Sequence, residues 1–212
     1  MIKIAVVDDQ NLIVNGLRMM IEAQEDMEVV WTAGNGLEAQ TKVGVCQPDI
    51  ILMDIRMPEA NGVEATKHIL ESHPEVKILV LTTFNEDAYI FDTLKAGASG
   101  YLLKDSPPSE LMDSIRKVIK GGIVIEPVVA TKVVHQINAA DIGQGREIIE
   151  KLTARELEIA KMISQGMSNR EISDAIFLSE GTVKNHLTSI LEKLNLRDRT
   201  QLAIIMLKSH LN

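Results

Sequence analysis

Short apolar runs alternate with amphipathic stretches between residue 2 and residue 120 of the chain. The apolar runs are rich in Ile, Val and Leu, which is typical of strands that are covered on both faces. The stretches between them repeat apolar residues at the spacing of one helix face. This alternation predicts an α/β fold with a doubly wound, five-stranded parallel sheet. Strands are predicted near 2–7, 28–32, 50–53, 77–81 and 100–103, and helices over about 11–22, 36–46, 61–72, 86–96 and 108–120.

The pattern becomes entirely helical from residue 152 onward. Two Ser/Thr-x-x-Glu capping boxes and two further capping residues mark the starts of four short helices. These starts lie at Thr153, Ser168, Ser179 and Asp198, and the helices are expected to end near residues 165, 175, 194 and 209. The sequence therefore predicts a compact all-α module after the sheet.

A stretch of small and polar residues separates these two patterns. After Gly121-Gly122 the periodicity weakens, and residues 138–145 (Asn-Ala-Ala-Asp-Ile-Gly-Gln-Gly) are typical of a linker. A chain of 212 residues is long enough for two domains. We therefore predict a first domain over residues 1–125, a linker over 126–148 and a second domain over 149–212.

Charge is distributed unevenly between these parts. The net charge is −8, but residues 1–145 carry 12 basic and 21 acidic residues, a net charge of −9. Residues 146–212 carry 10 and 9, a net charge of +1. The acidic part cannot itself attract nucleic acid, and binding by the second part has to rely on the local placement of charge.

The composition also bears on the compartment. Cys46 is the single cysteine, so no disulfide can form within the chain, which fits a reducing compartment. No apolar run approaches the roughly 18 residues of a membrane span, and Met1 leads directly into a predicted strand rather than into a signal peptide. We therefore expect a cytoplasmic protein with no membrane partner.

Three carboxylates are expected at one edge of the predicted sheet. Asp8 and Asp9 follow the first strand, and Asp54 follows the apolar run at 50–53. In an open parallel sheet, ligands bind outside the carboxyl ends of the strands, so these acids should lie close together. Like charges in such proximity require a cation, and a few oxygens suit Mg²⁺. A carboxylate beside Mg²⁺ can attack phosphorus and form an aspartyl phosphate.

Two further polar residues follow neighbouring strands. Thr82 follows the fourth strand and Lys104 follows the fifth, so both should project at the edge that holds the acids. A phosphoryl group on Asp54 needs its oxygens neutralised, and an ammonium group and a hydroxyl donor can contribute to this. We therefore assign Asp54, Thr82 and Lys104 to the predicted phosphorylation site.

This set of residues resembles the receiver domain of bacterial response regulators. The resemblance rests on Asp8-Asp9, on Asp54 in Met53-Asp-Ile-Arg-Met-Pro58, on Thr82, and on Tyr101 three residues before Lys104. It implies the strand order 2-1-3-4-5 and a sensor histidine kinase that phosphorylates Asp54. It also implies that Asp9, Asp54 and the backbone carbonyl of Arg56 bind Mg²⁺ directly, that Asp8 acts through water, and that Thr82 and Tyr101 form a switch pair. Receivers commonly have proline after the lysine; Asp105 stands there, so a cis peptide is not expected.

The helix predicted over residues 180–194 has one apolar stripe and one polar face. Lys184 and Thr188 share a face, because they are four residues apart. A short helix, a turn and this second helix match a helix-turn-helix, whose second helix enters the major groove. Lysine can donate to guanine and asparagine can bind adenine. The apolar stripe consists of Val183, Leu187, Ile190, Leu191 and Leu194, and the residues off it are Thr182, Lys184, Asn185 and Thr188.

The second domain resembles the LuxR-type output domain of NarL/FixJ-type response regulators. The match lies in Leu152-Thr-Ala-Arg-Glu156, Asn169-Arg-Glu-Ile172 and Ser179-Glu-Gly-Thr-Val-Lys-Asn-His186. It implies a DNA-binding transcription regulator that reads inverted-repeat promoter sites as a homodimer after phosphorylation, with base contacts from Lys184, Asn185 and Thr188 and with Thr182 beside them. RNA polymerase is a further candidate partner. Arg170 and Arg199 could contact phosphates or form surface ion pairs.

Two other functions fit part of the pattern. A Mg²⁺-dependent phosphohydrolase could also use Asp54 as its nucleophile, but its familiar type has a second acid two residues on. This chain has Arg56 there, which cannot donate a proton at neutral pH. A receiver whose output domain binds protein rather than DNA is the other alternative. Repeated turnover of a small phosphate ester would indicate the hydrolase, and a gel shift with genomic fragments would distinguish the two outputs.

Overall fold

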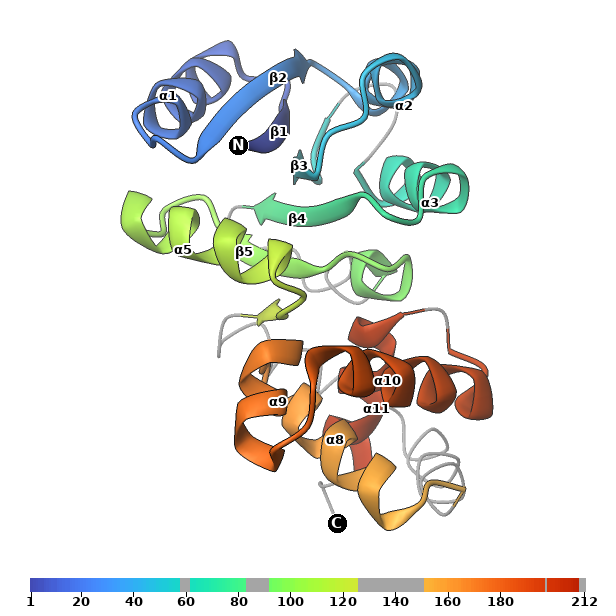
Figure 1. Ribbon diagram of the computed structural model, residues 1–212. Helices are drawn as coiled ribbons and strands as arrows, with labels where there is room; N and C mark the ends of the chain where they lie inside the picture. Colours follow the sequence, from blue (N-terminus) through green and yellow to red (C-terminus); the bar gives the residue numbers. More distant parts are fainter. Residues whose placement is uncertain (58–61, 83–91, 126–150, 197, 210–212) are drawn as a thin grey trace. The chain divides into compact units, whose positions relative to one another are not determined.

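The computed structural model describes residues 1–57, 62–82, 92–125, 151–196 and 198–209 (Figure 1). The chain forms two compact units, Met1–Ile119 and Lys120–Asn212. The predicted linker at 126–148 lies outside the described residues. No helix in the described ranges is long and apolar enough to cross a membrane.

The first unit is built on a parallel sheet. Its strands are β1 (Ile2–Val7), β2 (Met27–Ala33), β3 (Ile50–Asp54), β4 (Lys77–Thr82) and β5 (Gly100–Leu103). They lie in the order β2-β1-β3-β4-β5, and every adjacent pair among them is parallel, as predicted. The structure also has one described strand that the sequence pattern did not reveal, the two-residue β6 (Val124–Ile125), which follows the first unit in the chain.

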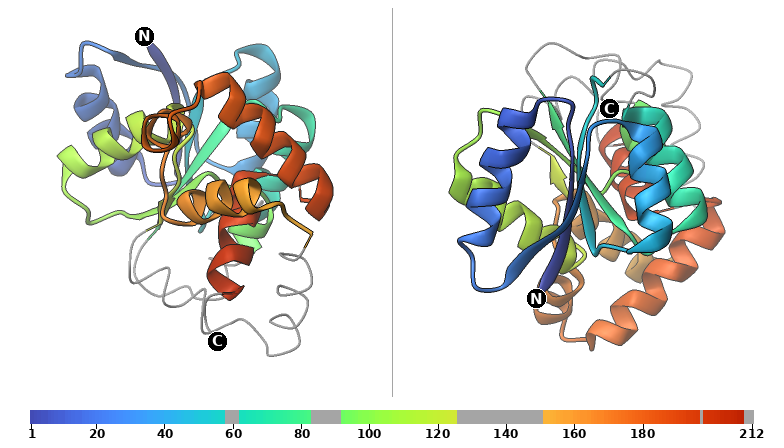
Figure 2. Two further views of the ribbon diagram at one scale, coloured as in Figure 1. Left: turned by 60° about the horizontal axis from the view of Figure 1, so that its bottom comes forward. Right: turned by 90° about the horizontal axis from the view of Figure 1, so that it is seen from above.

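Helices cover both faces of this sheet. On one side lie α1 (Asn11–Glu22) and α5 (Pro108–Ile119), and on the other α2 (Gly36–Val45) and α3 (Gly62–Ser72) (Figure 2, right). The middle strand is therefore buried along its whole length: all five residues of β3 are buried. This double coverage explains why the central strands read as apolar runs rather than as alternating patterns. Most of the helix predicted over 86–96 lies outside the described residues, and residues 92–95 are helical.

The second unit contains four described helices, in agreement with the prediction. They are α8 (Ala154–Ser164), α9 (Asn169–Ile176), α10 (Glu180–Leu194) and α11 (Arg199–Ser209). Both predicted capping boxes form, Ser179 caps α10, and the Asp198 carboxylate accepts a hydrogen bond from the Gln201 N–H. Gly166 adopts a positive φ of 78° after α8, which suits its place at a helix end.

The core of this unit is formed by apolar residues from all four helices. Within the stripe of α10, Val183, Ile190 and Leu194 are buried, while Leu187 and Leu191 are partly buried against the same core. The stripe therefore packs α10 against the other helices and leaves its opposite face to solvent.

Candidate functional site

The strand ends bring three carboxylates together. Val7 lies opposite Met53 in the parallel register of β1 and β3, so Asp8 and Asp54, one residue further along each strand, are neighbours. One carboxylate oxygen from each of Asp8, Asp9 and Asp54 lies within 4.8 Å of the others. Asp8 and Asp54 are buried and Asp9 is exposed. The predicted cluster is therefore a single acidic edge, formed by Asp8, Asp9 and Asp54 at the carboxyl ends of the strands.

Lys104 connects the two buried acids. Its ammonium Nζ lies 2.7 Å from Oδ2 of Asp8 and 2.9 Å from Oδ2 of Asp54. Its backbone N–H donates to the carbonyl of Thr82 at 2.7 Å, which fixes the end of β5 beside the end of β4. The remaining oxygen of Asp8 accepts a hydrogen bond from the Gln10 N–H at 2.9 Å. Residues from three strand ends thus form one bonded group.

The charges at this acidic edge do not balance. Burial raises the pKa of the Asp54 carboxyl, and the nearby Asp8 charge adds to this, while Lys104 counteracts it only in part. Burial alone would lower the pKa of Lys104, but its hydrogen bonds with Asp8 and Asp54 raise it above its usual value. Lys104 is therefore a fixed cation, and the acidic edge still has an excess of negative charge for a second cation to offset.

The donor set suits magnesium. Carboxylate oxygens are the ligands that Mg²⁺ takes in proteins, usually one or two of them with several waters. The spacing of Asp8, Asp9 and Asp54 allows a cation to approach all three, and the exposure of Asp9 leaves that side open to water. Arg56 lies two residues beyond Asp54, with an exposed side chain. The ligand role of its carbonyl stays a prediction.

The two residues predicted as a switch pair lie on neighbouring strands. Tyr101 pairs with Val80, and Thr82 pairs with Leu103, across β4 and β5. Side chains alternate along a strand, so Thr82 and Tyr101 project from the same face of the sheet, offset by two residues. Thr82 is buried, and the Tyr101 side chain is fully buried. This arrangement is what a relay between them needs, and the relay itself stays a prediction.

The peptide between Lys104 and Asp105 is not cis, because the described residues contain no cis peptide bond. This agrees with the presence of aspartate where receivers commonly have proline.

Gly62 is a site residue that the sequence analysis did not identify. It begins α3, and its N–H donates to the carbonyl of Ile55 at 2.9 Å. A Cβ at this position would lie 2.1 Å from the backbone oxygen of Asp54 and 2.9 Å from the Cα of Ile55. Only glycine therefore allows α3 to begin directly against the end of β3. A lone glycine in a loop-to-helix junction gives no sequence signal of such a contact.

The polar face of α10 presents the predicted base-reading residues unequally. Lys184, Asn185 and Thr188 are exposed, and Thr182 is partly buried. The Thr182 hydroxyl lies 2.8 Å from that of the capping residue Ser179, and the Thr188 hydroxyl donates to the Lys184 carbonyl at 3.1 Å. Both threonine hydroxyls are thus bonded within the helix. Lys184 and Asn185 are the residues whose side chains are most available for a ligand.

Arg199 is held inside the helical unit. Its guanidinium donates to the backbone carbonyl of Met167 and to Oδ1 of Asn169, the latter at 2.7 Å. Burial lowers its pKa to about 10. Arg199 therefore connects the start of α11 to the start of α9, and a role as a phosphate contact stays a prediction. Arg170 is exposed and keeps the role of candidate phosphate contact.

A doubly wound sheet with a buried aspartate and lysine at one edge, followed by a helix-turn-helix, is the architecture of a two-domain regulator with a DNA-binding output. Family models agree: "Response regulator receiver domain" matches residues 4–116, and "Bacterial regulatory proteins, luxR family" matches residues 150–206. The chain belongs to the response regulator family and combines a receiver domain with a LuxR-type DNA-binding domain. It is thus a DNA-binding regulator of transcription.

Individual relatives support this assignment. The transcriptional regulatory protein LnrK of Bacillus subtilis (strain 168) is 42% identical over 210 residues, which cover 96% of both chains. The crystal structure of the response regulator ChrA of a heme-sensing two-component system is 33% identical, with a TM-score of 0.54 over 96% of this chain and 95% of that one. A structure of two RcsB dimers bound to two parallel DNAs shares the fold at 21% identity, with a TM-score of 0.59 over 99% of this chain and 98% of that chain.

Proposed function

We propose that this protein switches its binding of promoter DNA when a partner histidine kinase phosphorylates Asp54. The observation that carries this proposal is the sharing of Lys104 between Asp54 and Asp8, beside a third carboxylate from Asp9. Such an edge brings together a carboxylate that can act as a nucleophile, a fixed cation and oxygen ligands for a metal. A regulator of this kind acts where the promoters are, in the cytoplasm.

The transfer step uses the carboxylate of Asp54 as nucleophile. One of its oxygens bonds to the phosphorus of a phosphohistidine, while the bond from phosphorus to the histidine nitrogen breaks and its electrons stay on that nitrogen. Lys104 stabilises the negative charge on the transferred group, and the hydroxyl of Thr82 donates to one of its oxygens. Bound Mg²⁺, held by Asp9, Asp54 and the carbonyl of Arg56 and through water by Asp8, would supply further positive charge. Attack by water later releases phosphate slowly.

The response begins at the end of β4. A new phosphoryl oxygen next to Thr82 draws its hydroxyl toward the acidic edge, and Tyr101 on the same face of the sheet repacks in consequence. Phosphorylation is then a local electrostatic event that biases a two-state element. We infer that the surface formed by the helix predicted over 86–96, β5 and α5 changes, and that this change frees the output helices or pairs them into a dimer.

DNA reading is assigned to α10. Lys184 would donate to a guanine and Asn185 would bind an adenine from within the major groove. Because the helical part of the chain has a net charge of only +1, one copy should bind weakly. Two copies reading an inverted repeat would supply the missing affinity. RcsB, which shares the fold, is a protein whose dimers bind DNA. RNA polymerase is a further proposed partner at the promoter.

Two measurements on the full-length protein test this function. Acetyl phosphate with Mg²⁺ should label Asp54 once, with slow decay, whereas repeated release of phosphate from a small ester would identify a hydrolase instead. A duplex selected from genomic fragments should bind more tightly after labelling. If no genomic fragment binds either the labelled or the unlabelled protein, the output domain does not read DNA.

A further inference from the structure

One buried acid of the helical unit lies outside the phosphorylation site and has contacts on two helices. Glu156 is in the first turn of α8, and only 4% of its surface is exposed. In the described part of this unit it is the only acidic residue that is buried. Burying a carboxylate is costly unless its charge is paired and its oxygens are hydrogen-bonded. The partners of Glu156 therefore explain why it can be buried.

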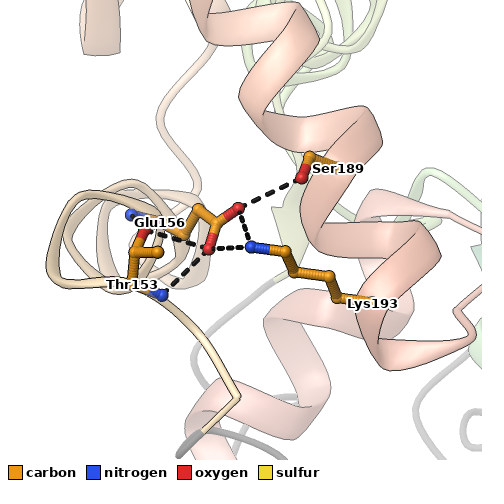
Figure 3. Close-up of polar contacts among 4 residues, drawn as sticks. All are labelled: Thr153, Glu156, Ser189 and Lys193. Atoms are coloured by element: carbon orange, nitrogen blue, oxygen red, sulfur yellow. Dashed lines mark hydrogen bonds and ion pairs between the residues drawn. The ribbon is translucent and has the colours of Figure 1, made fainter.

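The carboxylate bonds to the capping residue of α8 and to two residues of α10 (Figure 3). Oε2 accepts hydrogen bonds from the N–H of Thr153 at 2.9 Å, from the Thr153 hydroxyl at 3.0 Å and from the ammonium of Lys193 at 2.7 Å. Oε1 accepts a second bond from Lys193 at 2.7 Å and one from the Ser189 hydroxyl at 3.1 Å. One side chain therefore ties the cap of α8 to the C-terminal half of α10.

Capping alone does not require this arrangement. Glu171 occupies the corresponding position in the capping box of α9, and there it is exposed. A carboxylate at the surface is thus sufficient to cap a helix in this same fold. Glu156 is buried because α10 packs over it, and Lys193 and Ser189 satisfy the oxygens that this packing removes from water.

The contact also holds a defined side of α10. Lys193 is nine residues from Lys184, which is two and a half helical turns, so the two lysines project from opposite sides of the helix. Apolar packing alone permits small rotations, and a rotation of about 20° moves a side chain on a helix surface by about 2 Å. A hydrogen bond to a base edge does not survive such a shift. A bonded contact behind the helix would therefore fix the register of the base-reading face.

We propose that Glu156 is the positioning residue of the recognition helix: through Lys193 and Ser189 it sets the rotation of α10, and with it the position of Lys184 and Asn185 at the base edges. This proposal rests on the proposed role of α10 in reading DNA. Glu156 does not itself touch DNA. It determines sequence discrimination, which a residue that only stabilises the fold would not do.

The test compares Glu156→Gln with Glu158→Gln in the full-length, phosphorylated protein. Glu158 lies on the same helix and forms an exposed ion pair with Arg155, so both variants change the charge equally. Affinities are measured for a selected duplex and for its scrambled version, at one salt concentration and at a temperature below the melting point of every variant. Glu158→Gln should keep the ratio of the two affinities. Glu156→Gln should reduce it roughly tenfold, about the effect of one mismatched base pair.

Two further variants protect the test against unfolding. Lys193→Met removes the partner charge and should lower the same ratio, and its effect should not add to that of Glu156→Gln if the two residues act as one contact. Ser189→Ala removes a single hydrogen bond, leaves the ion pair in place and should lower the ratio by a smaller factor. An unchanged ratio in folded Glu156→Gln would overturn the proposal and leave Glu156 as a cap. If the unmodified protein itself shows no preference between the duplexes, the proposed reading of DNA fails, and the inference fails with it.

Discussion

Asp54 in the first unit and Glu156 in the second are both buried and paired with lysine, yet their pKa values are shifted in opposite directions. Asp54 shares Lys104 with Asp8, and its pKa is raised by burial. Glu156 has Lys193 together with three further hydrogen-bond donors, and its pKa is lowered to about 2, chiefly by Lys193. The difference shows that the number of hydrogen-bond donors around a buried carboxylate determines the direction of its pKa shift. The acidic edge has an excess of negative charge that a bound cation can offset. Both oxygens of Glu156 are hydrogen-bonded, and this residue joins α8 to α10.

The largest expected effect is on the reactive carboxylate. Replacing Asp54 by Asn removes the nucleophile and keeps the shape, so labelling by acetyl phosphate with Mg²⁺ should disappear completely. Burial disfavours the charge of Asp54, and the neutral variant should therefore melt no lower than the original protein in the absence of Mg²⁺. Intact-mass measurement follows the labelling. One full equivalent of phosphate on Asp54→Asn would move the acceptor to another residue.

The second effect concerns the backbone behind the same residue. Gly62→Ala places a Cβ 2.1 Å from the backbone oxygen of Asp54, so one of the two segments has to move by about 1 Å. A displacement of that size at a reacting group can slow a reaction by about 10²-fold. We expect slower phosphorylation and a higher Mg²⁺ requirement, measured as labelling rate against Mg²⁺ concentration below the melting temperature.

Gly44→Ala is the matched control for this change. Gly44 is on α2, and a Cβ there meets no atom within 4 Å. Alanine is favoured over glycine within a helix by roughly 0.5–1 kcal/mol, so this variant should be slightly more stable and should be phosphorylated normally. Equal labelling rates for both variants would show that the junction of β3 and α3 tolerates a side chain.

A third prediction concerns the exposed face of the recognition helix. Lys184→Ala should cost about 1–3 kcal/mol of binding free energy on the selected duplex and relax specificity at one base position. The control is Lys161→Ala, which removes an exposed lysine from α8. Titrations on selected and scrambled duplexes at several salt concentrations separate the two roles. Equal losses on both duplexes, with a salt slope reduced by about one unit, would make Lys184 a phosphate contact instead.

The free energy of unfolding should depend on pH through the carboxylate of Glu156. The folded-state pKa of Glu156 is about 2, below its ordinary value of 4.5, so its contribution is complete above the ordinary value and is lost as the pH falls toward 2. Glu156→Gln should therefore lower the free energy of unfolding by about 1–3 kcal/mol at neutral pH. The difference in free energy of unfolding between the original protein and Glu156→Gln, measured by denaturant titration, should decrease as the pH falls from 4.5 to 2. A gap that is independent of pH would mean that packing, rather than charge, is lost.

The smallest effect is expected at the turn of the helix-turn-helix. Phe177 and Asn195 both end a helix in the left-handed region, with φ of 56° and 52°. Asparagine tolerates this conformation, whereas a bulky residue is strained there, and 93% of the Phe177 surface is exposed. Phe177→Asn should therefore raise the free energy of unfolding by up to about 1 kcal/mol. A loss of stability, measured by thermal denaturation, would show that Phe177 has a packing role.

The acidic edge was predictable from the sequence because it follows from a local rule. Asp8, Asp54, Thr82 and Lys104 each end or follow a strand, and parallel strands place their carboxyl ends at one edge. The helix starts of the second unit were predictable for a similar reason, since capping residues act on their own first turn. Local patterns therefore determined the element order and most of the site.

Contacts between distant segments were not predictable in this way. The sequence around Glu156 predicts only a helix-capping role. Nothing near it indicates a contact with Lys193, which is 37 residues away. Gly62 matters because of a distance to Asp54 that only the folded chain defines. The bond from Arg199 to the Met167 carbonyl joins residues that are 32 positions apart, and nothing local to Arg199 indicates it. Each of these depends on how closely two elements approach, which hydrophobic spacing does not specify.

The link between the two regions is tested most directly by one titration. The affinity of the full-length protein for its selected duplex is measured before and after treatment with acetyl phosphate and Mg²⁺, alongside Asp54→Asn treated in the same way. The original protein should bind more tightly after treatment, and Asp54→Asn should bind with the same affinity in both states. An equal gain in both proteins, or no gain in either, would contradict control of DNA binding by phosphorylation at Asp54.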